Sequence, residues 1–401
     1  MGERSPDHSY AALCTCIFLI KFGFGIGVAF LTVWMKYRNV SLIEIGVIGT
    51  ATNLVGTCFV MFWGWFCNRF GRMRMIVSAG LVLAGIVYPM YIISDSFLVF
   101  LLLGLLNGIA RAMFNETAPI LTLVTAVIGP RRMGSRYGRY RLWGTVGYII
   151  AAVSAGVLAT QYGIPFVFVM GGVAYLAGAL SVGAYVNEAV ATSKSSQAVS
   201  QRTDNRIHRQ DILQRNLLVF IAVSTLNGLI QGAYGLFPLN LNRLGASDAL
   251  IGLSVAVGAV FEIPVMIYAG DLSDRIGRKT LLTFSYLIPT LTSVLIGLLS
   301  APVLSLMAFS LKGVSGGIDF AVSAIYLADE VPPERRSLIY GLVNSLKSVG
   351  TIIGPYVAAV LADRYGMANM FLIIGAYNLI PAALFSIGTK TKKPSIELHS
   401  P

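Results

Sequence analysis

Eight ionisable side chains lie deep inside long apolar stretches of the sequence, where a carboxylate could carry a proton and a cation could hold an anionic solute. An ionised group that faces lipid costs ~3 kcal/mol on the insertion scale. Eight of them would cost ~24 kcal/mol, more than a typical folding margin of roughly 5–15 kcal/mol. We therefore expect these side chains to face one another, water or a solute. They are Lys21, Arg111, Glu116, Arg141, Glu262, Lys312, Asp319 and Lys347.

The same apolar stretches offer few residues for metal binding, for nucleophilic catalysis or for proton transfer by histidine. The three histidines are predicted to lie in the tails and a linker, so proton transfer would fall to carboxylates, Glu262 and Asp319 first. The four cysteines lie in or beside apolar runs and are interpreted as small buried residues, not as metal ligands or disulfides. No nucleotide-binding loop is present. We expect neither an enzyme nor a cofactor.

Composition places these residues in a membrane. Of the 401 residues, 56% are hydrophobic and only 12% are charged, and the mean hydropathy is +0.74. The length allows about a dozen spans of roughly 20 residues and no sizeable soluble domain. The net charge of +12 could indicate a nucleic-acid-binding protein. Most of the basic residues, however, fall on one side of the predicted membrane spans, as is usual for membrane topology, so we expect no nucleic-acid partner.

Twelve all-helical spans are predicted, and the aromatic and methionine residues along them are interpreted as packing or lipid-facing groups. The spans are 10–35, 41–64, 75–94, 97–125, 141–160, 165–186, 215–241, 248–269, 280–299, 302–328, 338–362 and 368–388. Most of the 30 Lys and Arg residues then fall on the side that holds both termini, which predicts cytoplasmic termini. A polar segment, 187–214, is expected to link an N-terminal half, 1–186, to a C-terminal half, 215–401.

One glycine-punctuated charged segment occurs in both halves. Gly270-Asp-Leu-Ser-Asp-Arg-Ile-Gly-Arg-Lys279 is echoed upstream by Gly64-Trp-Phe-Cys-Asn-Arg-Phe-Gly-Arg-Met73. We predict a turn at each copy and a gating role for its shared positions. These positions are Gly64, Arg69, Gly71 and Arg72 in the first copy and Gly270, Asp274, Arg275, Gly277 and Arg278 in the second.

This repeated segment resembles the signature loop of the major facilitator superfamily. The resemblance implies two parallel six-helix bundles, related by an axis along the membrane normal, and secondary transport by alternating access across the cell membrane. Ser41 then aligns with Ser247. The resemblance also implies that helices three, six, nine and twelve lie outside the central cavity, and those predicted spans contain no charge. In the motif an aspartate contacts a helix N-terminus and helps to hold the cytoplasmic side closed. Asp274 keeps this residue in the second copy, whereas Asn68 replaces it in the first. We therefore expect the two halves to be held by contacts of unequal strength.

Helix four and helix ten offer opposite charges at equivalent depth. Arg111 shares a helix face with Asn107 and Asn115, whereas Glu116 is turned ~140° away. Lys312 and Asp319 lie ~10 Å apart along their helix, so each must meet another helix, water or solute. A solute could join Arg111 to Asp319, or the two could form a direct bridge.

The segment around Arg141 resembles the fifth helix of the lactose-permease and nucleoside–proton symporter branches, where the matching arginine holds a substrate hydroxyl. Thr122 stands where lactose permease has its substrate-binding glutamate, which argues against lactose. Glu262 resembles a functional eighth-helix glutamate of the nucleoside symporters and is our first proton-coupling residue, with Asp319 second. The substrate-binding candidates are Arg141, Arg111, Asn115, Lys21, Asn227, Lys312, Asp319 and Lys347.

These observations favour a monomeric, proton-coupled transporter of a small polar or anionic solute, whose partners are that solute, protons and the lipid bilayer. Five of the eight buried charges are cations, which favours anions. Two alternatives remain. A drug or sugar exporter is one, although helix five lacks the Gly-Pro pair of the drug antiporters. The other is a receptor or sensor on the same fold, which has no segment large enough for an output module.

Overall fold

The computed structural model describes residues 6–70, 72–114, 133–185, 214–332 and 335–390, and every regular element in those ranges is a helix. Long helices are expected because a backbone inside a bilayer must satisfy its own hydrogen bonds. Eleven helical segments are long and apolar enough to cross a membrane, and a shorter apolar helix, Phe97–Met113, begins the predicted fourth span. The rest of that span, 115–125, lies outside the described residues.

The N-terminal half contains six of the predicted spans. Its helices are α1 (Pro6–Tyr37), α2 (Leu42–Phe70), α3 (Met73–Met90) with the 3₁₀ turn η1 (Tyr91–Ile93), α4 (Phe97–Met113), α6 (Met133–Tyr162) and α7 (Ile164–Tyr185).

The C-terminal half repeats this order, with two of its spans interrupted. Its helices are α10 (Arg215–Tyr234), α11 (Phe237–Arg243), α12 (Asp248–Ile276), α13 (Arg278–Leu298), α14 (Pro302–Glu330), α15 (Arg336–Tyr365), α16 (Met367–Tyr377) and α17 (Leu379–Gly388). The seventh span is divided between α10 and α11, where Pro238 stands at the start of α11. Proline is tolerated there because the first turn of a helix has no partner for its N–H groups.

The aligned serines have the same local role in the two halves. The Ser41 hydroxyl accepts a hydrogen bond from the Glu44 backbone N–H (3.3 Å), just before α2. Ser247 caps α12 in the same way and accepts from Leu250 N (3.4 Å). Both halves thus begin their second helix with an N-cap of the same type.

The signature segments are more helical than the sequence suggested. We expected the spans to end at 64 and 269, but α2 continues to Phe70 and α12 to Ile276. In the second copy the chain turns at Gly277, whose φ of +92° is in the region that favours glycine. The helix α12 therefore continues beyond the apolar part of its span, and several of its last residues are charged.

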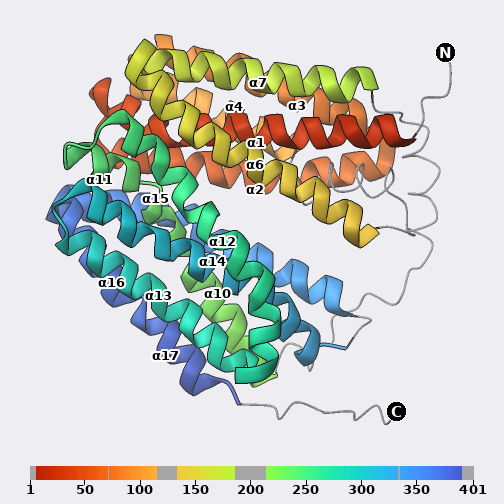
Figure 1. The fold of residues 1–401 in the computed structure, drawn as a ribbon, viewed down its shortest axis with the longest axis vertical. Helices are drawn as coiled ribbons and strands as arrows, with labels where there is room; N and C mark the ends of the chain where they lie inside the picture. The colour runs from red at the N-terminus through yellow and green to blue at the C-terminus, as the bar shows by residue number, and fades with distance from the viewer. Residues whose placement is uncertain (1–5, 71, 115–132, 186–213, 333–334, 391–401) are drawn as a thin grey trace.

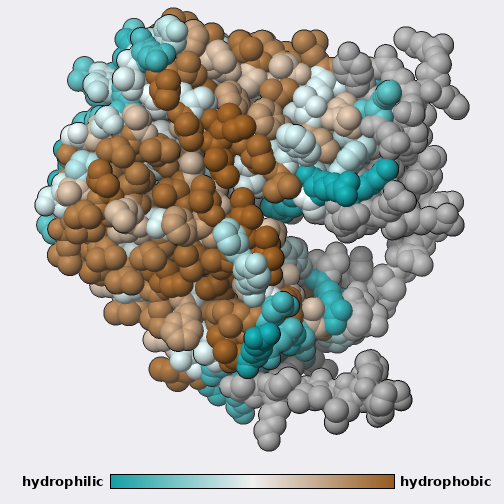
Figure 2. Space-filling view, viewed as in Figure 1, coloured by the Kyte–Doolittle hydropathy of each residue, from teal (hydrophilic) through white to brown (hydrophobic). Residues whose placement is uncertain are grey.

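The two halves pack together at one end and separate at the other (Figure 1). One apolar core runs through both halves, but two further clusters each belong to a single half, near the end where α1 begins and α17 ends. The surface is hollowed between the halves at that end (Figure 2). The molecule is therefore open toward the end that carries its first and last helical residues.

Close contacts between the halves seal the opposite end. A Cβ added to Gly156 of α6 would lie 2.7 Å from the Cα of Ala249 in α12, and one added to Gly46 of α2 would lie 2.4 Å from the Cβ of Ala359 in α15. The Asn53 amide also donates to the Thr351 carbonyl (3.0 Å). Only glycine permits such an approach of two helix backbones.

We expect Gly156→Val to weaken this seal, because its side chain would overlap the start of α12. Overpacking costs roughly 1–3 kcal/mol, which corresponds to about a fivefold to 150-fold change in the equilibrium between open and sealed states. Labelling of an Ala359→Cys reporter by a membrane-impermeant maleimide should accelerate accordingly. Gly138→Val on the same helix is the control, since a Cβ there meets nothing within 4 Å. Unchanged labelling in Gly156→Val would contradict the assignment of this seal.

Candidate functional site

Glu262 of α12 lies where both halves meet. Its carboxyl carbon is 3.7 Å from the position of a Cβ added to Gly316, so the carboxylate lies against α14. The cations within electrostatic range of this charge are Lys312, one turn earlier on α14, Arg141 of α6 and Lys21 of α1. One carboxylate and one cation of the C-terminal half therefore lie within electrostatic range of two cations of the N-terminal half.

Glu262 is half-buried and is absent from the direct ion pairs found among the described residues. The nearby cations therefore influence its charge without a direct ion pair among the described residues. A carboxylate in this position can accept a proton or be replaced by the anionic group of a solute.

Aromatic rings hold the cations of this site. The Lys312 ammonium lies 5.3 Å from the ring centroids of Tyr234 and Phe309, and the Arg141 guanidinium lies 4.8 Å from that of Phe320. These distances are typical of cation–π attraction. Arg141 and Phe320 belong to different halves, so their contact crosses the interface. Tyr234 and Phe309 are also buried members of the apolar core, as the sequence interpretation of aromatic residues expected, so the contact with Lys312 is added to a packing role.

Lys21 reaches the same region along α6. Its Cγ is 3.2 Å from the position of a Cβ added to Gly144, which follows Arg141 by one helical turn. The aliphatic stem of Lys21 thus packs on the face that carries Arg141, and a larger residue at position 144 would displace it. The close packing of α1 on α6 thus places Lys21 near the helix face that carries Arg141.

Arg111 occupies a separate place in the N-terminal half. Its guanidinium lies 4.8 Å from the Phe24 ring of α1. Asn107, one turn earlier, is only 5% exposed, and its Oδ1 has no partner in the part of the chain that is described. Asn115 and Glu116 lie outside the described residues, so the predicted polar stripe can be followed only as far as Arg111.

Asp319 pairs with Lys347 and not with Arg111. The Lys347 ammonium is 2.9 Å from Asp319 Oδ2, and the Ser323 hydroxyl donates to Oδ1 (2.8 Å). The direct Arg111–Asp319 bridge is therefore wrong among the described contacts, because a cation of α15 is nearer. Lys312 and Asp319 each meet another helix, as their spacing predicted. Asn227 of α10, a further substrate-binding candidate, is only 6% exposed.

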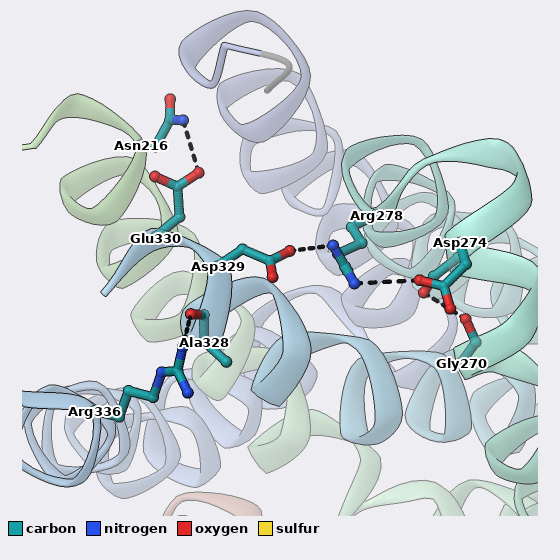
Figure 3. A network of polar contacts seen from close by, with 9 residues as sticks. Asn216, Gly270, Asp274, Arg278, Ala328, Asp329, Glu330 and Arg336 are labelled. Carbon is teal, nitrogen blue, oxygen red and sulfur yellow. Dashed lines mark hydrogen bonds and ion pairs between the residues drawn. The ribbon is translucent and has the colours of Figure 1, made fainter. Parts of the chain in front are cut away.

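The second signature segment forms a polar network (Figure 3). Arg278 donates to Asp274 (3.2 Å) and pairs with Asp329, which ties the start of α13 to the end of α14. Ser273 donates to the carbonyl of Gly270 (2.7 Å). Asp274, expected to meet a helix N-terminus, thus has the side chain of Arg278 as its partner, while Arg275 is exposed.

The first signature segment is described only in part. Gly64 lies within α2, and Arg69 and Arg72 are exposed. Gly71 and the side chain of Asn68 fall outside the described residues, so the unequal strength of the contacts that hold the halves stays a prediction.

No group of three or more His, Cys, Asp or Glu residues that could hold a metal ion occurs within the described ranges. The ionisable groups brought together here are instead single carboxylates among cations, an arrangement that suits proton and anion binding.

Comparison with known proteins agrees with this architecture. A family model described as "MFS_1 like family" matches residues 10–385. The cis,cis-muconate transport protein of Acinetobacter baylyi is 24% identical over 88% of this chain and 87% of its own length. The multidrug resistance protein MdtG of Escherichia coli is 24% identical over 84% and 82%.

Among solved structures, a mutant of the nucleoside transporter NupG superimposes with a TM-score of 0.81 over 95% of this chain and all of that one, at 15% identity. At this identity the likeness concerns the fold alone. It confirms the predicted all-α membrane fold of two six-helix bundles.

Removing one member of the Asp319–Lys347 pair should destabilise the protein, because it leaves the other charge uncompensated between α14 and α15. For Asp319→Asn we expect about 1–3 kcal/mol, below the cost for a fully buried pair, since about one-third of the Lys347 side chain is exposed. The measurement is thermal unfolding in detergent. Asp319→Asn/Lys347→Gln should recover part of the loss, and Asp271→Asn, at an exposed carboxylate, should have little effect. A double variant no more stable than Asp319→Asn would argue against coupling.

Proposed function

The chain belongs to the MFS_1 like family, and from this premise we propose that it carries a small polar or anionic solute across the cell membrane by alternating access, coupled to protons. As a transporter of the major facilitator superfamily, it is a multi-pass membrane protein and not an enzyme. The solute class, the coupling and the orientation are our proposal.

The observation that carries the proposal is the position of Glu262 within the field of Lys312, Arg141 and Lys21. Lys312 and Arg141 outnumber this one carboxylate, so these three groups carry a net charge of about +1 when all are ionised. That surplus suits a carboxylate or phosphate group on the solute and disfavours a lipophilic cation. The site also draws residues from both halves, so a bound solute would contact each side of the interface that must move.

Coupling follows from competition for the same cations. An ionised Glu262 partly neutralises Lys312 and Arg141, and a proton on Glu262 frees them for the solute anion. Proton uptake and solute binding would then favour each other, which is the linkage that symport requires. Asp319 is the second candidate for the proton, but it is already paired with Lys347 inside the C-terminal half.

The conformation supports alternating access. With both termini in the cytoplasm, as the distribution of Lys and Arg residues predicts, the open end faces the cytoplasm and the glycine contacts seal the outer end. We take 1–186 and 215–401 as the halves that rock about the site, joined by the segment 187–214.

An exporter is the second candidate, and the similarity to a multidrug resistance protein, MdtG, favours it. A site for lipophilic cations would need an unpaired carboxylate in excess over nearby cations. The reverse holds around Glu262, so we rank this alternative below the anion transporter.

A ligand screen tests the proposal directly. Purified protein in detergent would be heated with dicarboxylates including cis,cis-muconate, nucleosides, sugars and lipophilic cations. A ligand at a hundredfold its Kd should add ~2.7 kcal/mol of stability. We expect anionic solutes to stabilise the wild type but not Arg141→Ala, while Arg139→Gln, an exposed arginine of the same helix, keeps the effect. Stabilisation by lipophilic cations alone would make the exporter the better assignment.

Glu262→Gln should separate binding from coupling. The neutral amide resembles the protonated carboxyl, so the solute identified above should bind with an affinity that no longer rises as the pH falls. Proton-driven uptake into proteoliposomes should be lost, whereas exchange of internal for external solute continues. Asp271→Asn is the matched control. Proton-driven uptake that persists in Glu262→Gln would remove this residue from the coupling step.

A further inference from the structure

A second hollow lies outside the space between the halves, between α3 and α7 of the N-terminal half. Its volume is about 490 Å³. Arg72, Arg74 and Ser78, at and near the start of α3, supply the polar part of its lining. Gly183 of α7 lines the opposite side. No residue of the site around Glu262 belongs to it.

The glycine of α7 leaves this space open. Deeper in the membrane the same helices are in tight contact, since a Cβ on Gly172 would lie 2.8 Å from the Gly85 carbonyl oxygen. Near the end of α7 they diverge: a Cβ on Gly183 would meet only the Ser78 hydroxyl, at 3.6 Å. The hollow is therefore built by the divergence of two helices that are in tight contact about two to three turns away.

The electrostatics of the hollow favour an anion. Two guanidinium groups line it, and the first turn of α3 contains no acidic residue. Arg72, the residue that precedes α3, makes no side-chain cap, so the first backbone N–H groups of the helix also point a positive dipole toward this end. These charges stand where the apolar span begins, at the depth of lipid headgroups.

The remaining lining is apolar and continues into the membrane. Met75, Ala79 and Val82 line the hollow, and Met75 and Val82 begin an exposed stripe that runs along α3 through Ile86 to Met90. On α7 the corresponding exposed residues include Leu180. A ligand that complements this surface must be anionic at one end and hydrocarbon at the other.

We propose that the hollow binds an anionic phospholipid, with its phosphate group against Arg72 and Arg74 and its acyl chains along the exposed stripes of α3 and α7. Inorganic phosphate shares the charge but would leave the apolar lining uncovered. The site is separate from the proposed transport site, and neither assignment depends on the other.

Native mass spectrometry of the intact protein, titrated with phosphatidylglycerol or phosphatidylcholine, tests this proposal. Each arginine near a membrane surface contributes roughly a fivefold gain in affinity for anionic lipid. Arg72→Gln should therefore weaken phosphatidylglycerol binding by about that factor. Gly183→Leu should abolish it by filling the hollow without changing any charge. Arg139→Gln, which removes an exposed arginine that does not line the hollow, is the control.

Selective binding of phosphatidylglycerol that is lost in Gly183→Leu and kept in Arg139→Gln would support the site. Equal binding of phosphatidylcholine would overturn the role of the arginines. Unchanged binding in Gly183→Leu would show that lipid associates elsewhere. Displacement of phosphatidylglycerol by millimolar inorganic phosphate would reassign the hollow to a soluble anion.

Discussion

The cost of an ionised side chain in hydrocarbon is the constraint on which the arrangement of this protein depends. Each buried charge must find a partner other than lipid, and the structure provides three kinds. Asp319 and Lys347 neutralise each other within the C-terminal half. Arg111 and Lys312 lie against aromatic rings. Glu262 remains in the field of cations from both halves without a direct ion pair among the described residues.

These three arrangements of buried charge respond differently when the halves move or a solute binds. A direct pair such as Asp319–Lys347 is nearly neutral and changes little when the halves move, because both groups belong to one half. A cation held on a ring can turn toward an incoming anion, since cation–π attraction contributes only about 0.5–2 kcal/mol. Glu262 and Arg141 depend on the relation between the halves, which makes their surroundings sensitive to the conformational change that transport requires.

Small residues determine where the two halves can close. At the sealed end, Gly156 and Gly46 bring helices of opposite halves into backbone contact. At the other end the apolar core divides into clusters that each belong to one half, so separation there exposes little shared hydrophobic surface. The Arg278 network stays within the C-terminal half and braces α13 against α14. The halves can therefore move as units about a site that lies between them.

The sequence by itself determined the membrane class, the twelve spans, the internal repeat and the identity of the charges that must avoid lipid. Each of these follows from local properties: the length of apolar runs, the recurrence of a motif, and the cost of one ion in hydrocarbon. The sequence did not determine partners. Asp319 could have met Arg111, but the packing of α14 on α15 brings Lys347 to 2.9 Å. The contact of Arg141 with Phe320 and the hollow beside Gly183 likewise arise from helices distant in sequence. Only the tertiary structure decides such pairings, because helical periodicity fixes which residues share a face but not which helix that face meets.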